Sequence, residues 1–207
     1  MGKRNLERAL ARVPPARRAD VSVRWRPFKL TPEWPAGSYP VPKKEFYDRK
    51  FGPGRWQGFL PRLGQAFAAV GLEFTMGGET GPTHDAHRLL CWADDVGGLQ
   101  AQDALQEELM FRYFSEGKPP SDHGVLLDAV KAAGSGLDVD AAKEVLDNAE
   151  MGAARLEGEL ARYARGVRGV PHFVFTDEAS GRAVQLSGAQ PPEVILDALE
   201  ELGVPTE

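Results

Sequence analysis

The chain has 207 residues, a single cysteine and a formal net charge of −5 at pH 7. Its 42% hydrophobic and 27% charged residues are ordinary for a globular protein, which excludes wholesale disorder. One cysteine excludes a disulfide within the chain, and it excludes two-cysteine redox chemistry for the sequence as written. The longest apolar run, about Ala66–Leu72, falls far short of the roughly 20 residues of a membrane helix, so we expect no membrane partner.

Positive charge is concentrated at the start of the chain. Residues 1–30 hold nine Lys or Arg and two acids, whereas the remainder holds 16 basic and 28 acidic residues. Such a start is found in nucleic-acid binders and in mitochondrial transit peptides. No basic stripe recurs, however, so we interpret this region as a solvated helix followed by a charged strand, and we expect no nucleic-acid partner. No apolar signal segment follows the early Lys and Arg, which favours a cytoplasmic protein, with an organelle as the alternative if a longer N-terminus exists.

Hydrophobic spacing predicts a helix, a strand and a long loop in the first quarter of the chain. Leu6 and Leu10 share one helical face, whereas Val21, Val23 and Trp25 alternate with polar residues as in a half-buried strand. The expected elements are a helix over Gly2–Ala11, a strand over Ala19–Phe28, and a proline-rich loop over Leu30–Pro53 with a short helical piece around Lys44–Lys50.

The middle of the chain is predicted to be entirely helical. Apolar residues keep helical spacing, Pro61 marks a kink or a helix start, and short polar side chains stand where helices should begin. The expected helices cover about Trp56–Val70, Thr83–Val96, Gly98–Phe114 and Ser121–Ala133, then one capped by Asp140, and finally Met151–Arg165.

In the C-terminal part of the sequence, apolar residues recur with the period of two that is typical of strands. Two short strands, His172–Thr176 and Ala183–Ser187, are expected to pair as a hairpin through the five-residue connection Asp177–Gly181. Pro191 and Pro192 then open a final helix over Glu193–Leu202. The element order is helix, strand, helical block, strand, strand, helix.

This order resembles an α/β thioredoxin-like fold with a large helical insertion and with its first strand missing. Short stretches of sequence resemble the DsbA-like thioredoxin-fold family, in its FrnE-like branch, in the right order along the whole chain. The resemblance implies a single domain over residues 1–207, with thioredoxin parts at about 1–30 and 168–207 and the insertion at about 43–165. The stretches are Gly2–Leu10, Arg24–Leu30, Lys50–Pro53, Gly71–Phe74, Thr83–Leu89, Gly169–Val174 and Ser187–Glu193.

The resemblance implies a thiol–disulfide oxidoreductase whose substrate is a thiol- or disulfide-containing protein or small molecule, with no cofactor. Family members carry a strand leading into Cys-Pro-x-Cys just before the Gly-Lys-Arg of the first helix, where this sequence has Met1. No catalytic residue can therefore be carried over. We expect a chain that is catalytically incomplete as written, its strand and cysteines lying upstream of Met1. The alternatives are a non-catalytic binding module for a peptide or partner, and a relative of the kappa-type glutathione-dependent isomerases and transferases, which would also need an upstream residue.

One element of the redox site does carry over, the pair Val170-Pro171. It matches the family's loop with a cis-proline, which implies that the backbone of Val170 can pair with an extended substrate segment. Val170 and Pro171 are therefore the expected substrate-binding residues. The alternative is a trans proline that simply begins a strand.

The resemblance implies that the missing strand would lie between Val21–Phe28 and Phe173–Thr176, as it does in the family's fold. Its absence would leave a slot with unpaired backbone groups and exposed apolar side chains, or a collapse that pairs its two neighbours. We therefore expect the 207-residue chain to aggregate or to be partly unfolded. The side chains expected to be exposed are Val21, Val23, Phe173 and Phe175.

His84, His87 and Cys91 share one face of a predicted helix and could in principle present three ligands to zinc. Because no fourth ligand is evident, we predict no metal site and interpret Cys91 as a small buried thiol. Asp138 and Asp140 are interpreted as helix caps. Of the tryptophans, Trp25, Trp56 and Trp92 are expected in the core, and Trp34 is expected to be exposed or to line a groove.

Overall fold

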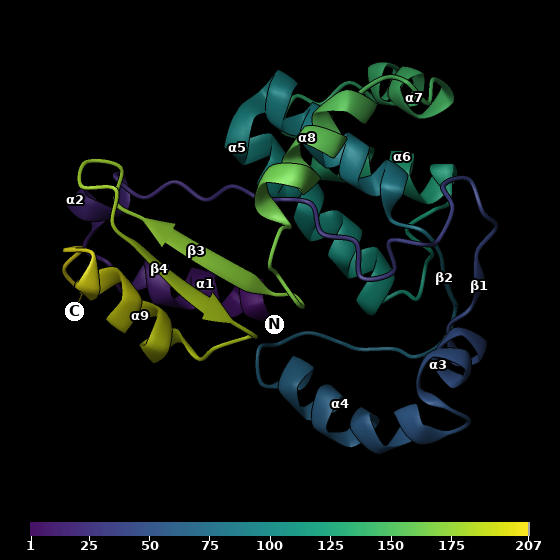
Figure 1. The fold of residues 1–207 in the computed structure, drawn as a ribbon, viewed down its shortest axis with the longest axis horizontal. Coiled ribbons are helices and arrows are strands. Elements are labelled where there is room, and N and C mark those ends of the chain that lie inside the picture. Colours follow the sequence, from purple (N-terminus) through teal and green to yellow (C-terminus); the bar gives the residue numbers. More distant parts are fainter. Residues whose placement is uncertain (207) are drawn as a thin grey trace. The chain divides into compact units, whose positions relative to one another are not determined.

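The computed structural model describes residues 1–206. The chain divides into two compact units, each visible in Figure 1. One combines Met1–Val23 with the residues from Gly166 onward, and the other is the continuous stretch Arg24–Arg165. None of the helices among residues 1–206 has both the length and the apolar character that crossing a bilayer requires.

The discontinuous unit is built around an antiparallel hairpin. Its two strands pair as the hairpin that the sequence predicts, and the structure gives the register Phe173↔Leu186. Leu6 and Ala9 form the buried stripe of the first helix, which packs against the last helix and its buried Ile195. The elements are α1 (Gly2–Ala11), α2 (Pro15–Arg18), β3 (His172–Thr176), β4 (Ala183–Ser187) and α9 (Pro192–Glu201).

The continuous unit is mainly helical. Buried aliphatic side chains from the three helices α5, α6 and α7, among them Leu89, Leu105, Leu126 and Val145, form its main core. In chain order the elements are β1 (Val41–Pro42), α3 (Lys43–Phe51), the 3₁₀ helix η1 (Arg55–Phe59), α4 (Leu60–Ala68), β2 (Glu79–Thr80), α5 (His84–Phe114), α6 (His123–Ala133), α7 (Val139–Asp147) and α8 (Ala153–Tyr163). The two-residue strands β1 and β2 pair with each other and were not expected from the sequence.

Several predicted helix boundaries need correction. The break expected between the helices on either side of residue 97 is present, because Gly98, at φ 67° and ψ −165°, is not helical, although the two helices run on as the single element α5. Asp122 rather than Ser121 caps α6. Its carboxylate accepts a hydrogen bond from the backbone amide of Val125, three residues further along the chain. Asp138 caps α7 in the same way, while Asp140 lies in the first turn of that helix.

The predicted strand Ala19–Phe28 is not a strand. The half-buried and exposed side chains alternate over residues 21–26 as expected, but the segment pairs with no other strand among residues 1–206. Side chains from α5 satisfy part of its backbone instead. Gln102 accepts a hydrogen bond from the Trp25 amide at 2.8 Å and donates one to the Trp25 carbonyl at 3.1 Å, and His87 Nε2 lies 3.2 Å from the carbonyl oxygen of Phe28.

The expected exposure of apolar side chains is also only partly right. In the described chain the β3–β4 sheet has two strands, but Phe173 is buried at 8% exposure, and its ring lies beside Gly2 of α1. Val21, Val23 and Phe175 are half-buried. Phe173 stays covered because α1 supplies the neighbouring surface. The expected tendency to aggregate remains a prediction.

Among residues 1–206, Arg88 is the largest fully buried side chain, with 1% of its surface exposed. Its guanidinium donates to Asp85 and to three carbonyl oxygens at and beyond the end of α7, those of Val145, Asn148 and Met151. The last carbonyls of a helix have no partner within the helix, so a buried fork of donors satisfies them where water cannot.

We predict that Arg88→Ala lowers the free energy of unfolding by about 3–5 kcal/mol, because it leaves a cavity and several buried carbonyls without donors. Urea unfolding measures this loss. Arg49→Ala, at an exposed position on α3, is the control and should change stability by less than about 0.5 kcal/mol. Similar losses for the two variants would contradict the role assigned to Arg88.

Protonation of His87 should make the free energy of unfolding depend on pH. Burial lowers the pKa of its ring from 6.5 to about 4, so the folded protein holds it neutral while the unfolded chain takes up a proton below pH 6.5. The stabilising contribution is therefore complete above pH 6.5 and is lost as the pH falls toward about 4. Over this pH range the free energy of unfolding of His87→Gln should fall by about 1–3 kcal/mol less than that of the wild-type protein. Carboxylates titrate in both proteins and cancel, so identical profiles would refute the prediction.

Candidate functional site

The first turn of α1 lies directly against the loop that leads into β3. A Cβ atom placed on Gly2 would come within 2.7 Å of Pro171 Cγ and within 3.3 Å of Phe173 Cζ, and the first of these distances is closer than real Cβ contacts allow. Glycine at position 2 is thus what permits the N-terminus of the helix to contact Pro171. These are the elements that the sequence resemblance placed at the redox site.

The loop presents free backbone at Val170. The Val170–Pro171 peptide bond is cis, and the Pro171 carbonyl accepts a hydrogen bond from the Gly188 amide at 2.8 Å, which fixes the loop to the end of β4. Val170 is 48% exposed. No group within residues 1–206 forms a hydrogen bond with its backbone N–H or C=O. An extended segment could therefore bind to this residue in the manner of an added strand.

Two basic residues of the first turn of α1, Lys3 and Arg4, share one carboxylate, that of Glu7. Lys3 is buried and forms an ion pair with Glu7, and Arg4 Nη1 lies 2.7 Å from Glu7 Oε2. Burial alone would raise the pKa of Glu7, but hydrogen bonds from Lys3 and Arg4 outweigh it and hold that pKa below its ordinary value. The carboxylate therefore stays ionised near neutral pH.

Cys91 lies on α5, in the continuous unit, and is only 4% exposed. Burial raises the pKa of its thiol to about 11. The thiolate, which is the nucleophile in disulfide exchange, is then scarce at neutral pH. Cys91 therefore has the properties of a core residue rather than those of a redox cysteine.

The two histidines near Cys91 are engaged with the segment before the proline-rich loop. His84 Nδ1 lies 3.0 Å from Lys29 Nζ, and His87 Nε2 lies beside the Phe28 carbonyl. Across residues 1–206 no three His, Cys, Asp or Glu side chains gather closely enough to hold a metal ion. The geometry gives no support to a zinc site at these residues.

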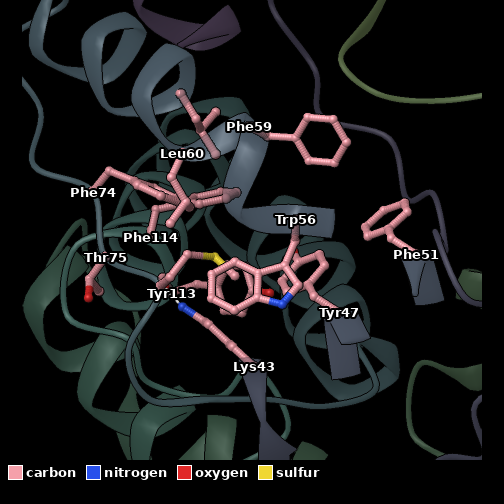
Figure 2. Close-up of a pocket in the computed structure, with 12 residues that line it drawn as sticks. Lys43, Tyr47, Phe51, Trp56, Phe59, Leu60, Phe74, Thr75, Tyr113 and Phe114 are labelled. Carbon is pink, nitrogen blue, oxygen red and sulfur yellow. Dashed lines mark hydrogen bonds between the residues drawn. The ribbon is translucent and has the colours of Figure 1, made fainter. Parts of the chain in front are cut away.

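Sequence reasoning missed a second feature, an apolar pocket of about 220 Å³ in the continuous unit (Figure 2). Its walls come from α3, η1, α4 and the end of α5, and Lys43 is its only charged lining residue. The aromatic residues between positions 46 and 59 were the available signal, but their spacing does not show that they enclose a space with Tyr113.

The tryptophans divide differently from expectation. Trp56 is buried at 7% exposure and donates through Nε1 to Asp48, whereas Trp25 and Trp92 are half-buried. Trp34 is also half-buried and stacks on Phe46, with ring centroids 4.9 Å apart. Only Trp56 is therefore a core residue in the strict sense.

Comparisons with known proteins agree with this geometry. A family model described as a DSBA-like thioredoxin domain matches residues 1–200. The crystal structure of a probable DsbA oxidoreductase from Streptomyces coelicolor superposes with a TM-score of 0.79 and is 31% identical, covering 100% of this chain and 85% of that one. A search of curated proteins gives no match. The fold is thus a DsbA-like thioredoxin fold with a helical insertion, and the chain belongs to the DSBA-like thioredoxin domain family.

Proposed function

We propose that this protein is a DsbA-like thioredoxin-fold protein of the thiol–disulfide oxidoreductase class, in the FrnE-like branch. The family match and the structural similarity support the class. The branch rests on sequence stretches such as Gly2–Leu10 and Gly169–Val174. The observation that carries the proposal is the contact between the N-terminal turn of α1 and Pro171, because it brings a helix N-terminus and a substrate-binding loop together.

The chemistry of this class explains why those two parts belong together. A thiolate at a helix N-terminus attacks one sulfur of a disulfide, the sulfur–sulfur bond breaks, and the other sulfur leaves as a thiolate. The unpaired N–H groups and the dipole of the helix stabilise the attacking thiolate. In this chain α1 supplies the helix end, while the backbone of Val170 holds an extended segment of a thiol- or disulfide-containing protein or small molecule.

The same proposal makes the 207-residue chain catalytically incomplete. Its one cysteine is buried on α5 and no cysteine lies on α1, so neither the attacking nor the resolving thiol is present at the Gly2 end of the helix.

A second candidate function follows from the exposed backbone of Val170. The loop can bind an extended peptide without any chemistry, which would make the protein a non-catalytic binding module.

The domain limits and the location belong to the proposal as well. We take residues 1–207 as one DsbA-like domain, with thioredoxin parts near 1–30 and 168–207 and a helical insertion near 43–165, working in the cytoplasm. The division between Arg165 and Gly166 supports the later limit, whereas the first compact unit ends at Val23, earlier than the proposed limit near residue 30.

We predict that the 207-residue chain does not accelerate the reduction of insulin disulfides by dithiothreitol. The only thiol has a pKa of about 11 and is buried, so it supplies almost no thiolate. Precipitation of the reduced insulin chain, followed by turbidity, measures the rate. Cys91→Ser should give the same trace. Turnover above background that survives Cys91→Ser would defeat the proposal, since it would require chemistry that these residues do not provide.

A variant extended before Met1 by a β-strand followed by Cys-Pro-x-Cys should gain disulfide reductase activity, because α1 and the Pro171 loop would then flank a dithiol. In this extended variant, Val170→Pro removes one backbone donor and should raise KM for a peptide disulfide about 2–10-fold. Val170→Ala keeps the donor and is the matched control, with KM changed less than about twofold. An extended protein that folds but shows no activity would favour the binding module.

A further inference from the structure

The pocket in the continuous unit has a feature that its apolar lining does not account for. Lys43, at the start of α3, is only 2% exposed and its side chain lies among the aromatic residues drawn in Figure 2. Its Nζ donates to the Tyr113 carbonyl at 2.5 Å and lies 4.0 Å from the centroid of the Tyr113 ring. These contacts hold the amine against the end of α5.

No acid balances this buried amine. Within residues 1–206 no Asp or Glu oxygen lies within 4.0 Å of Lys43 Nζ, whereas Lys3, the other buried lysine of the described chain, is paired with Glu7. A buried ammonium normally has a counter-charge, because desolvation is costly. The cost appears in the pKa of Lys43, which burial lowers to about 8. An ammonium has three donors, and the Tyr113 carbonyl takes one.

We propose that this pocket binds a small apolar molecule that carries a single carboxylate, which pairs with Lys43 Nζ while the apolar body lies among the aromatic rings. The volume of about 220 Å³ suits a body of about two fused rings, since a 150 Å³ apolar cavity accommodates benzene. Phe51 and Phe59 pack edge to face and are 40% and 57% exposed, so they form the mouth through which the ligand enters.

The test compares 2-naphthoate with 2-naphthamide by isothermal titration calorimetry on the full chain. The two probes share one apolar body and differ in charge. At pH 7 the wild-type protein should bind 2-naphthoate about tenfold or more tightly than 2-naphthamide, because only the carboxylate forms a charge-assisted bond with Lys43. Lys43→Met should abolish that preference by weakening 2-naphthoate alone. Lys44→Met changes the net charge equally at the exposed neighbouring position and should leave both affinities as they are.

Because Lys43 also holds the Tyr113 carbonyl, a pH series on the wild-type protein provides evidence that needs no variant. The affinity for 2-naphthoate should fall about tenfold between pH 7 and pH 9, as the amine loses its proton, while that for 2-naphthamide stays constant. The other titratable groups that line the pocket are the phenols of Tyr47 and Tyr113, and burial raises the pKa of Tyr113 well above its usual range.

Three results would overturn the proposal. They are equal affinities for the two probes in the wild-type protein, a loss of 2-naphthoate affinity in Lys44→Met as large as that in Lys43→Met, and the failure of 2-naphthoate to bind. A flat pH profile for 2-naphthoate would equally refute the role of Lys43.

Discussion

The approach of α1 to Pro171 is the constraint around which the discontinuous unit is organised. It requires that residue 2 have no side-chain carbon, because a Cβ atom there would stand 2.7 Å from Pro171 Cγ. Given that approach, the Phe173 ring is covered and Asn5 can donate to the Gln190 carbonyl at 2.8 Å. One missing methyl group thus lets α1, β3 and the turn before α9 meet in one place, where the candidate site lies.

Sequence patterns predicted elements well wherever the determining contacts are local. The bounds of α1, β3 and β4 agree with the structure, because helical spacing and alternation are properties of the segment itself. The strand expected over Ala19–Phe28 failed for the opposite reason. Alternation predicts which side chains face the protein, but a strand also needs a neighbour, and Gln102 of α5 takes that place. No local pattern shows that a side chain distant in sequence will satisfy a backbone.

The same contrast between local and distant contacts separates the Val170–Pro171 loop from the apolar pocket. The Val170–Pro171 loop was expected through the family resemblance, which the short stretch Gly169–Val174 beside a predictable strand carries. The apolar pocket was not, because Lys43 and the Tyr113 carbonyl that it contacts are 70 positions apart. Lys43 and Lys44 are adjacent and chemically identical in the sequence, yet one is buried and the other exposed. Which of them faces the interior depends on how α3 packs against the end of α5.

The division of the chain also governs the order in which it can fold. Residues 24–165 are continuous, so their helices can pack as soon as they have left the ribosome. The other unit needs both ends of the chain, since the contact between Asn5 and Gln190 closes a loop of 185 residues. Closing so long a loop carries a large entropic cost, which falls if the intervening residues are already compact. The first helix must therefore wait through most of synthesis for its partners, and the Val170–Pro171 loop comes to lie against it only when the last part of the protein, from Gly166 onward, is being made.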